Sequence, residues 1–204
     1  LRLLSLRTRN SAAYKGVMAL LLEAQSRDLM RGDPIELTNF FHESVDIHHV
    51  FPKAWCEKNG IHRDRYDSII NKTPLTAQTN QSVGGKAPSA YLKGLEGHVQ
   101  PHELDTYLAT HLIAPATMRA DDFDAFMIDR ATQLLTAIEG KMGREIQGRD
   151  SEQVHEKFGG ALLPTVAATA SVRGRLYDRY DILEELGGGA MAQAYRVKDT
   201  NNGR

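Results

Sequence analysis

The sequence of 204 residues has one cysteine and no long apolar segment. A single thiol, Cys56, excludes an internal disulfide and a zinc site built on paired cysteines, and it favours a reducing compartment. The longest uninterrupted apolar run, residues 17–22, is far shorter than the roughly 18 residues of a membrane span. The basic N-terminus is not followed by the apolar core and cleavage site of a signal peptide. The sequence therefore predicts a cytoplasmic protein.

The chain also lacks a strong net charge, which is −1 at neutral pH. Lys and Arg exceed Asp and Glu by four in residues 1–93, and the acidic residues exceed the basic ones by five in residues 94–204. A polyanion would approach the first part, but an excess this small predicts by itself only a surface of mixed sign. With 41% apolar residues the chain can bury one full hydrophobic core. Since it begins with Leu1 and ends within a motif at Arg204, we expect a piece of a longer polypeptide.

Helical periodicity marks four segments of the chain, and an irregular stretch separates the first of them from the other three. Residues 35–47 are predicted to be extended, and residues 48–87 to be a functional loop system or disordered. Helices are predicted over residues 11–29, 88–95, 102–113 and 121–142.

The irregular stretch contains the side chains that are most informative about chemistry. His48 and His49 follow one another at the end of a predicted strand, so they should point to opposite sides, one toward a metal and one toward a substrate. Asn80 can offer an amide oxygen to a hard cation, and Asn71 can fix a loop through its backbone. Thr76 is a good helix N-cap, which places Asn80 in the first turn of a short helix. A second short strand is predicted around residues 68–70.

This arrangement resembles the HNH endonucleases, which carry a ββα-metal (His-Me) finger, and within them the nuclease domain of GmrSD-type modification-dependent restriction systems. The resemblance covers about the first 70% of the chain. It is carried by DIHHVFPKAW (46–55), SIINKTPLT (68–76), TNQSVGGKAPSAYL (79–92) and DDFDAF (121–126).

The resemblance implies a role for each matched residue. His49 would be the general base, His48 and Asn80 the protein ligands of one divalent ion, and Asn71 the residue that keeps the catalytic loop in shape. Asp46 lies two residues before His48 on the same side of the strand, so we expect it to orient His48. The ion would be Mg²⁺ or Mn²⁺, with Ni²⁺ or Zn²⁺ as alternatives because His is a softer ligand than Asp.

The expected reaction is hydrolysis of DNA phosphodiester bonds to 5′-phosphate and 3′-hydroxyl ends, in restriction or anti-phage defence. Phosphate contacts would position the DNA without reading its sequence. The basic residues expected to make them are Lys53, Arg63, Arg65, Lys72 and Lys86.

The end of the chain resembles the opening of a bacterial Ser/Thr protein kinase, RYDILEELGGG (179–189) followed by YRV (195–197). Gly187 and Gly189 match the first two glycines of the phosphate-binding hairpin, whereas Ala192 and Ala194 replace its third Gly and its Val. The strand lysine and the catalytic loop of a kinase are missing, so we expect no kinase activity from this chain.

The predicted fold class is α+β, a mainly helical domain around a ββα-metal finger with a C-terminal β-hairpin fragment. The predicted division is an HNH domain over residues 1–145 with its finger at about 44–84, a linker over 146–178, and an incomplete kinase hairpin over 179–204. Two alternatives stay open: a catalytically idle nucleic-acid-binding module, and a regulatory fragment of a nuclease–kinase fusion. A nucleotide-hydrolysing partner domain or subunit is a further expectation from the GmrSD-type resemblance.

Overall fold

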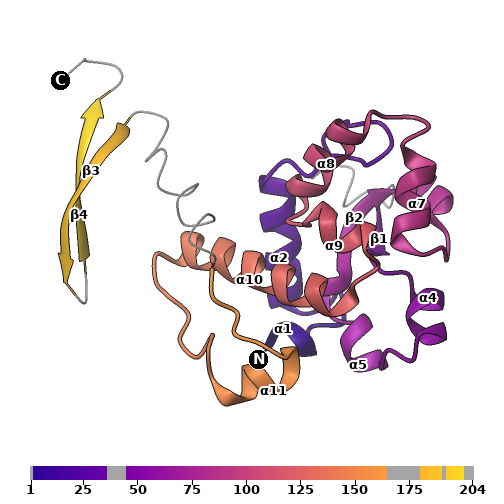
Figure 1. Ribbon diagram of the computed structural model, residues 1–204, viewed down its shortest axis with the longest axis horizontal. Coiled ribbons are helices and arrows are strands. Elements are labelled where there is room, and N and C mark those ends of the chain that lie inside the picture. The colour runs from indigo at the N-terminus through magenta and orange to yellow at the C-terminus, as the bar shows by residue number, and fades with distance from the viewer. Residues whose placement is uncertain (1, 36–44, 165–179, 190–191, 200–204) are drawn as a thin grey trace. The chain divides into compact units, whose positions relative to one another are not determined.

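The computed structural model describes residues 2–35, 45–164, 180–189 and 192–199, and for residues 2, 45, 46 and the last two strands it describes the backbone alone. The chain divides into two compact units, Leu1–Leu163 and Pro164–Arg204. The first unit is mixed α/β and mostly helical, with one two-stranded antiparallel sheet (Figure 1). The predicted α+β class is confirmed at this level.

The N-terminal part forms α1 (Arg2–Ser5) and α2 (Ala12–Glu23). Ser11 is the N-cap of α2, and its hydroxyl accepts a hydrogen bond from the backbone N–H of Tyr14. The predicted continuation of this helix to residue 29 is wrong. The backbone turns at Gln25, which has a positive φ, and the Ser26 hydroxyl then binds the carbonyl of Leu21 and closes the helix end.

The sheet is a ribbon of β1 (Val45–His49) and β2 (Lys72–Thr76), with His48 opposite Thr73 and His49 opposite Lys72. The predicted second strand at residues 68–70 is displaced. Residues Ile69–Asn71 instead form a 3₁₀ turn, because the buried Ile69 and Ile70 face the core and the Ile69 N–H bonds to Leu6 near the N-terminus. Pro74 is tolerated in β2 because each strand of a two-stranded ribbon has one unpaired edge.

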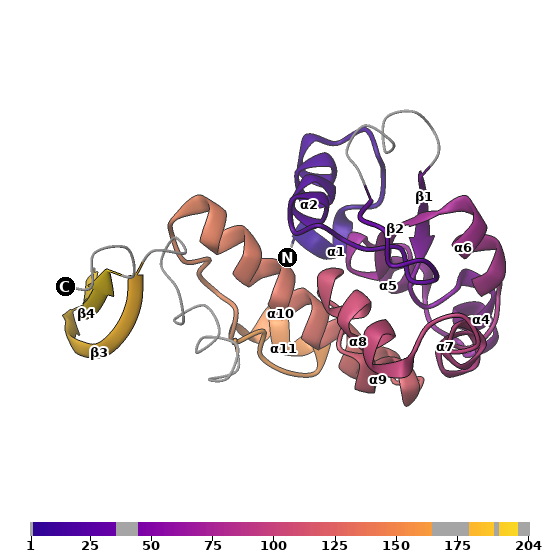
Figure 2. The same cartoon turned by 90° about the horizontal axis from the view of Figure 1, so that it is seen from above.

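Short helices replace the irregular stretch that the periodicity predicted for residues 48–87. Helices of four to seven residues are too short to show a hydrophobic period. They are α4 (Lys53–Lys58), α5 (Arg63–Tyr66) and α6 (Ala77–Val83). Figure 2 shows α6 beside β1, with α4 and α7 close by.

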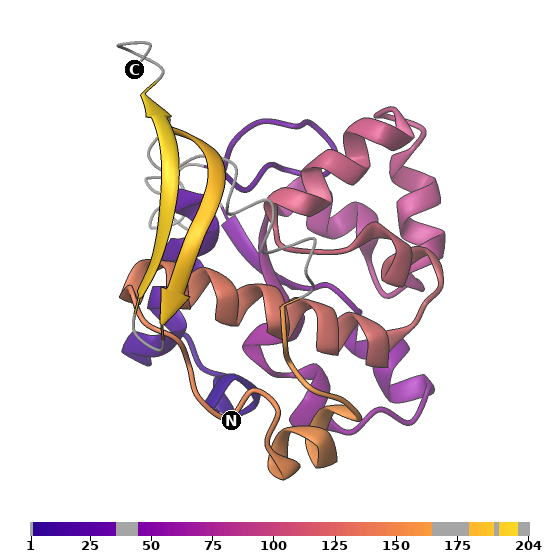
Figure 3. The same cartoon turned by 60° about the vertical axis from the view of Figure 1, so that its left-hand side comes forward.

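The remaining helices cover the ribbon and complete the core. The prediction for residues 88–95 is confirmed, and the other two predicted helices are confirmed to within three residues. The helices are α7 (Pro88–Leu95), α8 (Pro101–Thr110), α9 (Pro115–Arg119), α10 (Phe123–Met142) and α11 (Glu152–Phe158). Helix α10 is the longest and runs across the unit in Figure 3. Within the described part of the chain, no helix combines the length and the apolar character needed to cross a membrane.

Among the fully buried polar side chains, Arg130 of α10 and His111 make hydrogen bonds between distant parts of the chain. The Arg130 guanidinium donates to the carbonyls of Ile70 and His111. The His111 ring bridges Thr73 of β2 at 2.7 Å and the carbonyl of Arg27 at 2.6 Å. These bonds connect α10, the ribbon and the loop after α2, which are far apart in the sequence.

The first unit extends beyond the predicted boundary at residue 145. Val154 and Phe158 of α11, and Leu162 after it, are buried in the same core, and the guanidinium of Arg149 binds Glu139 of α10 and the Leu162 carbonyl. Residues 146–163 are therefore part of the unit rather than linker. Their apolar positions are too few for a recognisable period.

The second unit contains an antiparallel hairpin of β3 (Tyr180–Gly189) and β4 (Ala192–Asp199), as the sequence predicts. Its register is irregular between Ile182 and Glu184 and again between Glu185 and Gly187. The resemblance to the opening of a kinase stays a prediction.

Candidate functional site

The two adjacent histidines of β1 have different surroundings. The His48 side chain is buried, and its Nδ1 lies 2.7 Å from Oδ1 of Asn80. The His49 side chain is 26% exposed, and its Nε2 lies 3.3 Å from Oδ1 of Asp67. The separation follows from strand geometry, because successive side chains point to opposite faces.

Asn80 is held in place by the start of α6. Thr76 is the N-cap, as predicted, and its hydroxyl accepts from the Thr79 N–H. The buried carboxylate of Asp28 then accepts hydrogen bonds from the backbone and hydroxyl of Thr76 and from the hydroxyl of Thr79. Burial alone would raise the pKa of Asp28, but these bonds lower it below its ordinary value. The loop after α2 thus fixes the helix that carries Asn80.

Asn71 is fully buried and uses its side chain on backbone groups. Its Oδ1 accepts from the Phe51 N–H at 2.7 Å, and its Nδ2 donates to the carbonyls of Phe51 and Tyr66, both at 2.9 Å. The turn after β1 is therefore fastened to the segment before β2. Asn71 shapes this turn and offers no polar atom to a ligand.

A charged cluster stands behind His49. Oδ1 of Asp67 also lies 2.8 Å from Nζ of Lys72, and the Arg63 guanidinium lies 3.6 Å from Oδ2. Burial lowers the pKa of His49 below its ordinary value; the hydrogen bond to Asp67 opposes this, and the charge of Lys72 adds to it. The His49 imidazole is therefore neutral near pH 7.

The predicted basic residues fall into two groups. Lys53, Arg63 and Lys86 are exposed. Arg65 is paired with Asp124 at 2.6 Å and lies over the ring of Phe123. The prediction that Lys72 contacts phosphate is contradicted, because its side chain is 8% exposed and its ammonium binds Asp67 and the Arg7 carbonyl.

Asp46 pairs through its backbone with Leu75 in the ribbon. The expected contact of its carboxylate with His48 lies outside the side chains that the structure describes.

The donor set of His48 and Asn80 fits a single divalent ion. In this structure His48 Nδ1–H donates a hydrogen bond to Asn80 Oδ1 over 2.7 Å. Two ligand atoms on adjacent positions of an ion at about 2.1 Å would be roughly 3 Å apart, so the same two atoms would fit an ion once Nδ1 has given up that proton. Neither side chain is a carboxylate, and in the described residues no group of three or more His, Cys, Asp or Glu side chains could hold an ion. An ion here would need water and substrate oxygens to complete its coordination.

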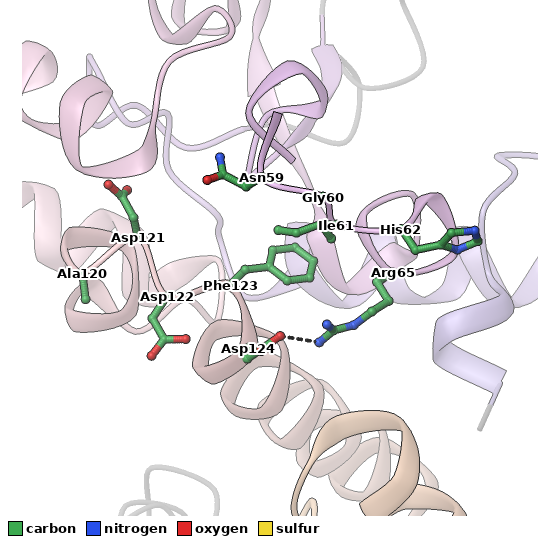
Figure 4. Close-up of a pocket in the computed structure, with 10 residues that line it drawn as sticks. All are labelled: Asn59, Gly60, Ile61, His62, Arg65, Ala120, Asp121, Asp122, Phe123 and Asp124. Atoms are coloured by element: carbon green, nitrogen blue, oxygen red, sulfur yellow. Dashed lines mark hydrogen bonds and ion pairs between the residues drawn. The ribbon is translucent and has the colours of Figure 1, made fainter. Parts of the chain in front are cut away.

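A hollow of about 690 Å³ lies between the α4–α5 segment and the start of α10 (Figure 4). Its charged groups are already used within the protein. Arg65 pairs with Asp124, Asp121 accepts from the backbone and hydroxyl of Ser89, and Asp122 caps α10. We assign no ligand to it.

Asp28 and Asp67 are not among the site residues expected from the sequence. Asp67 directly precedes the matched segment 68–76, so its neighbourhood was a usable signal. No sequence signal identifies Asp28, because its partners lie 48 and 51 residues further along the chain.

Comparison with known proteins gives one partial relative. A stretch of 83 residues is 35% identical to MJ0686 of Methanocaldococcus jannaschii, a protein described as uncharacterised. The match covers 41% of this chain and 13% of that protein's length. No family model matches the chain, and no solved structure matches it significantly.

Proposed function

We propose that the first unit is a metal-dependent DNA endonuclease of the HNH type, with a ββα-metal finger formed by β1, β2 and α6. The single observation that carries the proposal is the 2.7 Å approach of His48 Nδ1 to Asn80 Oδ1, with a second, partly exposed imidazole on the next residue. Strand β1 supplies the two histidines and helix α6, which follows β2, supplies Asn80, in the order that the resemblance implies.

Each residue of the proposed site has a separate role in phosphodiester hydrolysis. His48 and Asn80 would hold a divalent ion, which would neutralise charge on the scissile phosphate and stabilise the leaving oxygen. His49 accepts the proton of the attacking water, for which a neutral imidazole is required. We place the phosphate at the end of β1, where the chain turns away after His49.

The bonds of Asn71 support this arrangement. They keep the turn after His49 tied to the residues before β2, so that the base and the ligand are presented by one rigid ribbon. Lys53 and Lys86 are the exposed cations that we assign to backbone phosphates. We propose, on the basis of the resemblance, a role in restriction or anti-phage defence together with a nucleotide-hydrolysing partner.

Plasmid cleavage tests the proposal, with modified and unmodified DNA in EDTA, Mg²⁺, Mn²⁺, Ni²⁺ or Zn²⁺. We expect metal-dependent nicking that His48→Ala and Asn80→Ala abolish. His98→Ala is the matched control, since His98 is exposed and belongs to no part of the site. Folded wild-type protein that binds DNA and cuts with none of the ions would instead support the idle binding module.

A further inference from the structure

Asp67 contacts two cationic or potentially cationic groups with one oxygen atom. Its Oδ1 lies 3.3 Å from His49 Nε2 and 2.8 Å from Lys72 Nζ. The residue is the C-cap of α5, so the helix end fixes its backbone. Lys72 is the register partner of His49 across the ribbon, and its ammonium also binds the Arg7 carbonyl. The position of the Asp67 carboxylate is therefore fixed by the end of α5, by His49 and by Lys72.

The protonation of the contact follows from its partners. Burial would raise the pKa of Asp67, but the hydrogen bond and charge of Lys72 lower it below its ordinary value. An ionised carboxylate only accepts hydrogen bonds. In neutral His49 the proton must then be on Nε2, and Nδ1 is left as the acceptor.

We propose that Asp67 is a positioning residue, which fixes His49 as its Nε2–H tautomer and leaves Nδ1 to take the proton from the attacking water. Lys72 holds the Asp67 carboxylate in place. This inference rests on the proposed nuclease function. Water can reach the His49 ring, since 26% of its side chain is exposed. The ring of Tyr66 packs against it, with 6.3 Å between ring centroids.

The tautomer can be measured without any cleavage assay. In ¹⁵N-labelled protein, long-range ¹H–¹⁵N spectra above the pKa of His49 distinguish a protonated from an unprotonated ring nitrogen, with His49→Gln to assign the signals. We expect a protonated Nε2 and a bare Nδ1. A neutral ring with the proton on Nδ1 would overturn the inference. Because the result needs no activity, it stands even if the wild type cuts no DNA.

Two substitutions separate orientation from simple ion pairing. Lys72 can only donate, so Asp67→Asn should turn its amide oxygen to the shared point and still accept the Nε2 proton, without the charge. Asp67→Ala offers no acceptor. We expect Asp67→Ala to lower kcat about 10- to 100-fold, with KM and metal affinity unchanged, and Asp67→Asn to recover most of kcat.

The matched control is Asp64→Asn, an exposed carboxylate one turn earlier, for which we expect wild-type kcat. If the Asp67–Lys72 ion pair served only the fold, Asp67→Asn and Asp67→Ala would lose kcat equally. Equal kcat losses in Asp67→Asn and Asp67→Ala, or wild-type kcat in Asp67→Ala, would overturn the positioning role.

Discussion

Asn71 and Asn80 are nine residues apart and chemically identical, yet their surroundings differ completely. Asn71 is fully buried and binds only backbone groups, whereas Asn80 is half-buried and faces the ring of His48. The same contrast separates His111, buried between Thr73 and Arg27, from the partly exposed His49. One member of each pair binds only groups that hold the fold together, and the other belongs to the site proposed above.

The difference shows that residue type alone does not identify a functional side chain. What distinguishes the two members is which atoms their polar groups bind. Asn71 is fixed by neighbouring backbone, and His111 by a hydroxyl and a carbonyl, so neither can take a ligand without breaking the core. Substitutions of Asn71 or His111 should therefore lower the stability of the fold, whereas substitutions of Asn80 or His49 should lower DNA cleavage.

His49→Ala should have the largest effect, and on catalysis alone. Loss of a general base lowers the cleavage rate roughly 10²- to 10⁴-fold. The change leaves the His48–Asn80 pair untouched, so metal affinity, measured by titration with Mn²⁺, should stay at the wild-type value. Nicking by the variant at the wild-type rate would show that the base is elsewhere.

Asn71→Ala should act on stability. It leaves the Phe51 N–H and the carbonyls of Phe51 and Tyr66 without their partner in a buried site. We expect the free energy of unfolding in urea to fall by about 3–5 kcal/mol. Asn59→Ala, at an exposed position where the amide donates one hydrogen bond to the Trp55 carbonyl, is the control and should cost about 1 kcal/mol. A small loss in Asn71→Ala would remove the contrast with Asn80.

The pH dependence of stability should identify His111. Burial lowers its pKa to about 4, so between about pH 6.5 and pH 4 the unfolded chain binds a proton that the folded one does not. The contribution of neutral His111 to the free energy of unfolding is fully present above this range, and about 3 kcal/mol of it is lost as the pH drops through the range. Urea unfolding at several pH values measures the loss. His111→Gln should flatten the curve, whereas His98→Gln should not.

The exposed lysines should show the smallest effect. Lys53→Ala and Lys86→Ala are each expected to weaken DNA binding a few-fold and to reduce the slope of log affinity against log salt by about 1. Fluorescence anisotropy with labelled DNA at several salt concentrations measures both. Lys72→Met should leave the salt slope unchanged, because the ammonium is bound to Asp67 inside the protein.

Much of the fold could be predicted where the signal is local. Ser11, Thr76 and Asp122 each begin a helix through a side chain that binds a backbone N–H three residues on, a relation visible in the sequence. The short helices α4 and α5 and the position of β2 could not be predicted, because they depend on burial of Ile69 and Ile70 and on a bond to Leu6.

The candidate site shows the same division. His48, His49, Asn71 and Asn80 could be identified in the sequence because they lie in the segments that resemble the HNH endonucleases. The buried state of Lys72 and the part played by Asp67 depend on the register of the ribbon and on the end of α5, which only the structure supplies.

Arg130 has a consequence for the order in which the protein is made. Its guanidinium binds the carbonyl of Ile70, next to Asn71, yet it belongs to a helix fifty residues beyond Asn80 (130 against 80). During synthesis every residue of the candidate site leaves the ribosome before Arg130, whose guanidinium binds the backbone beneath that site. A chain that ended before α10 would contain every residue of the candidate site but would lack the hydrogen bond from Arg130 to the Ile70 carbonyl.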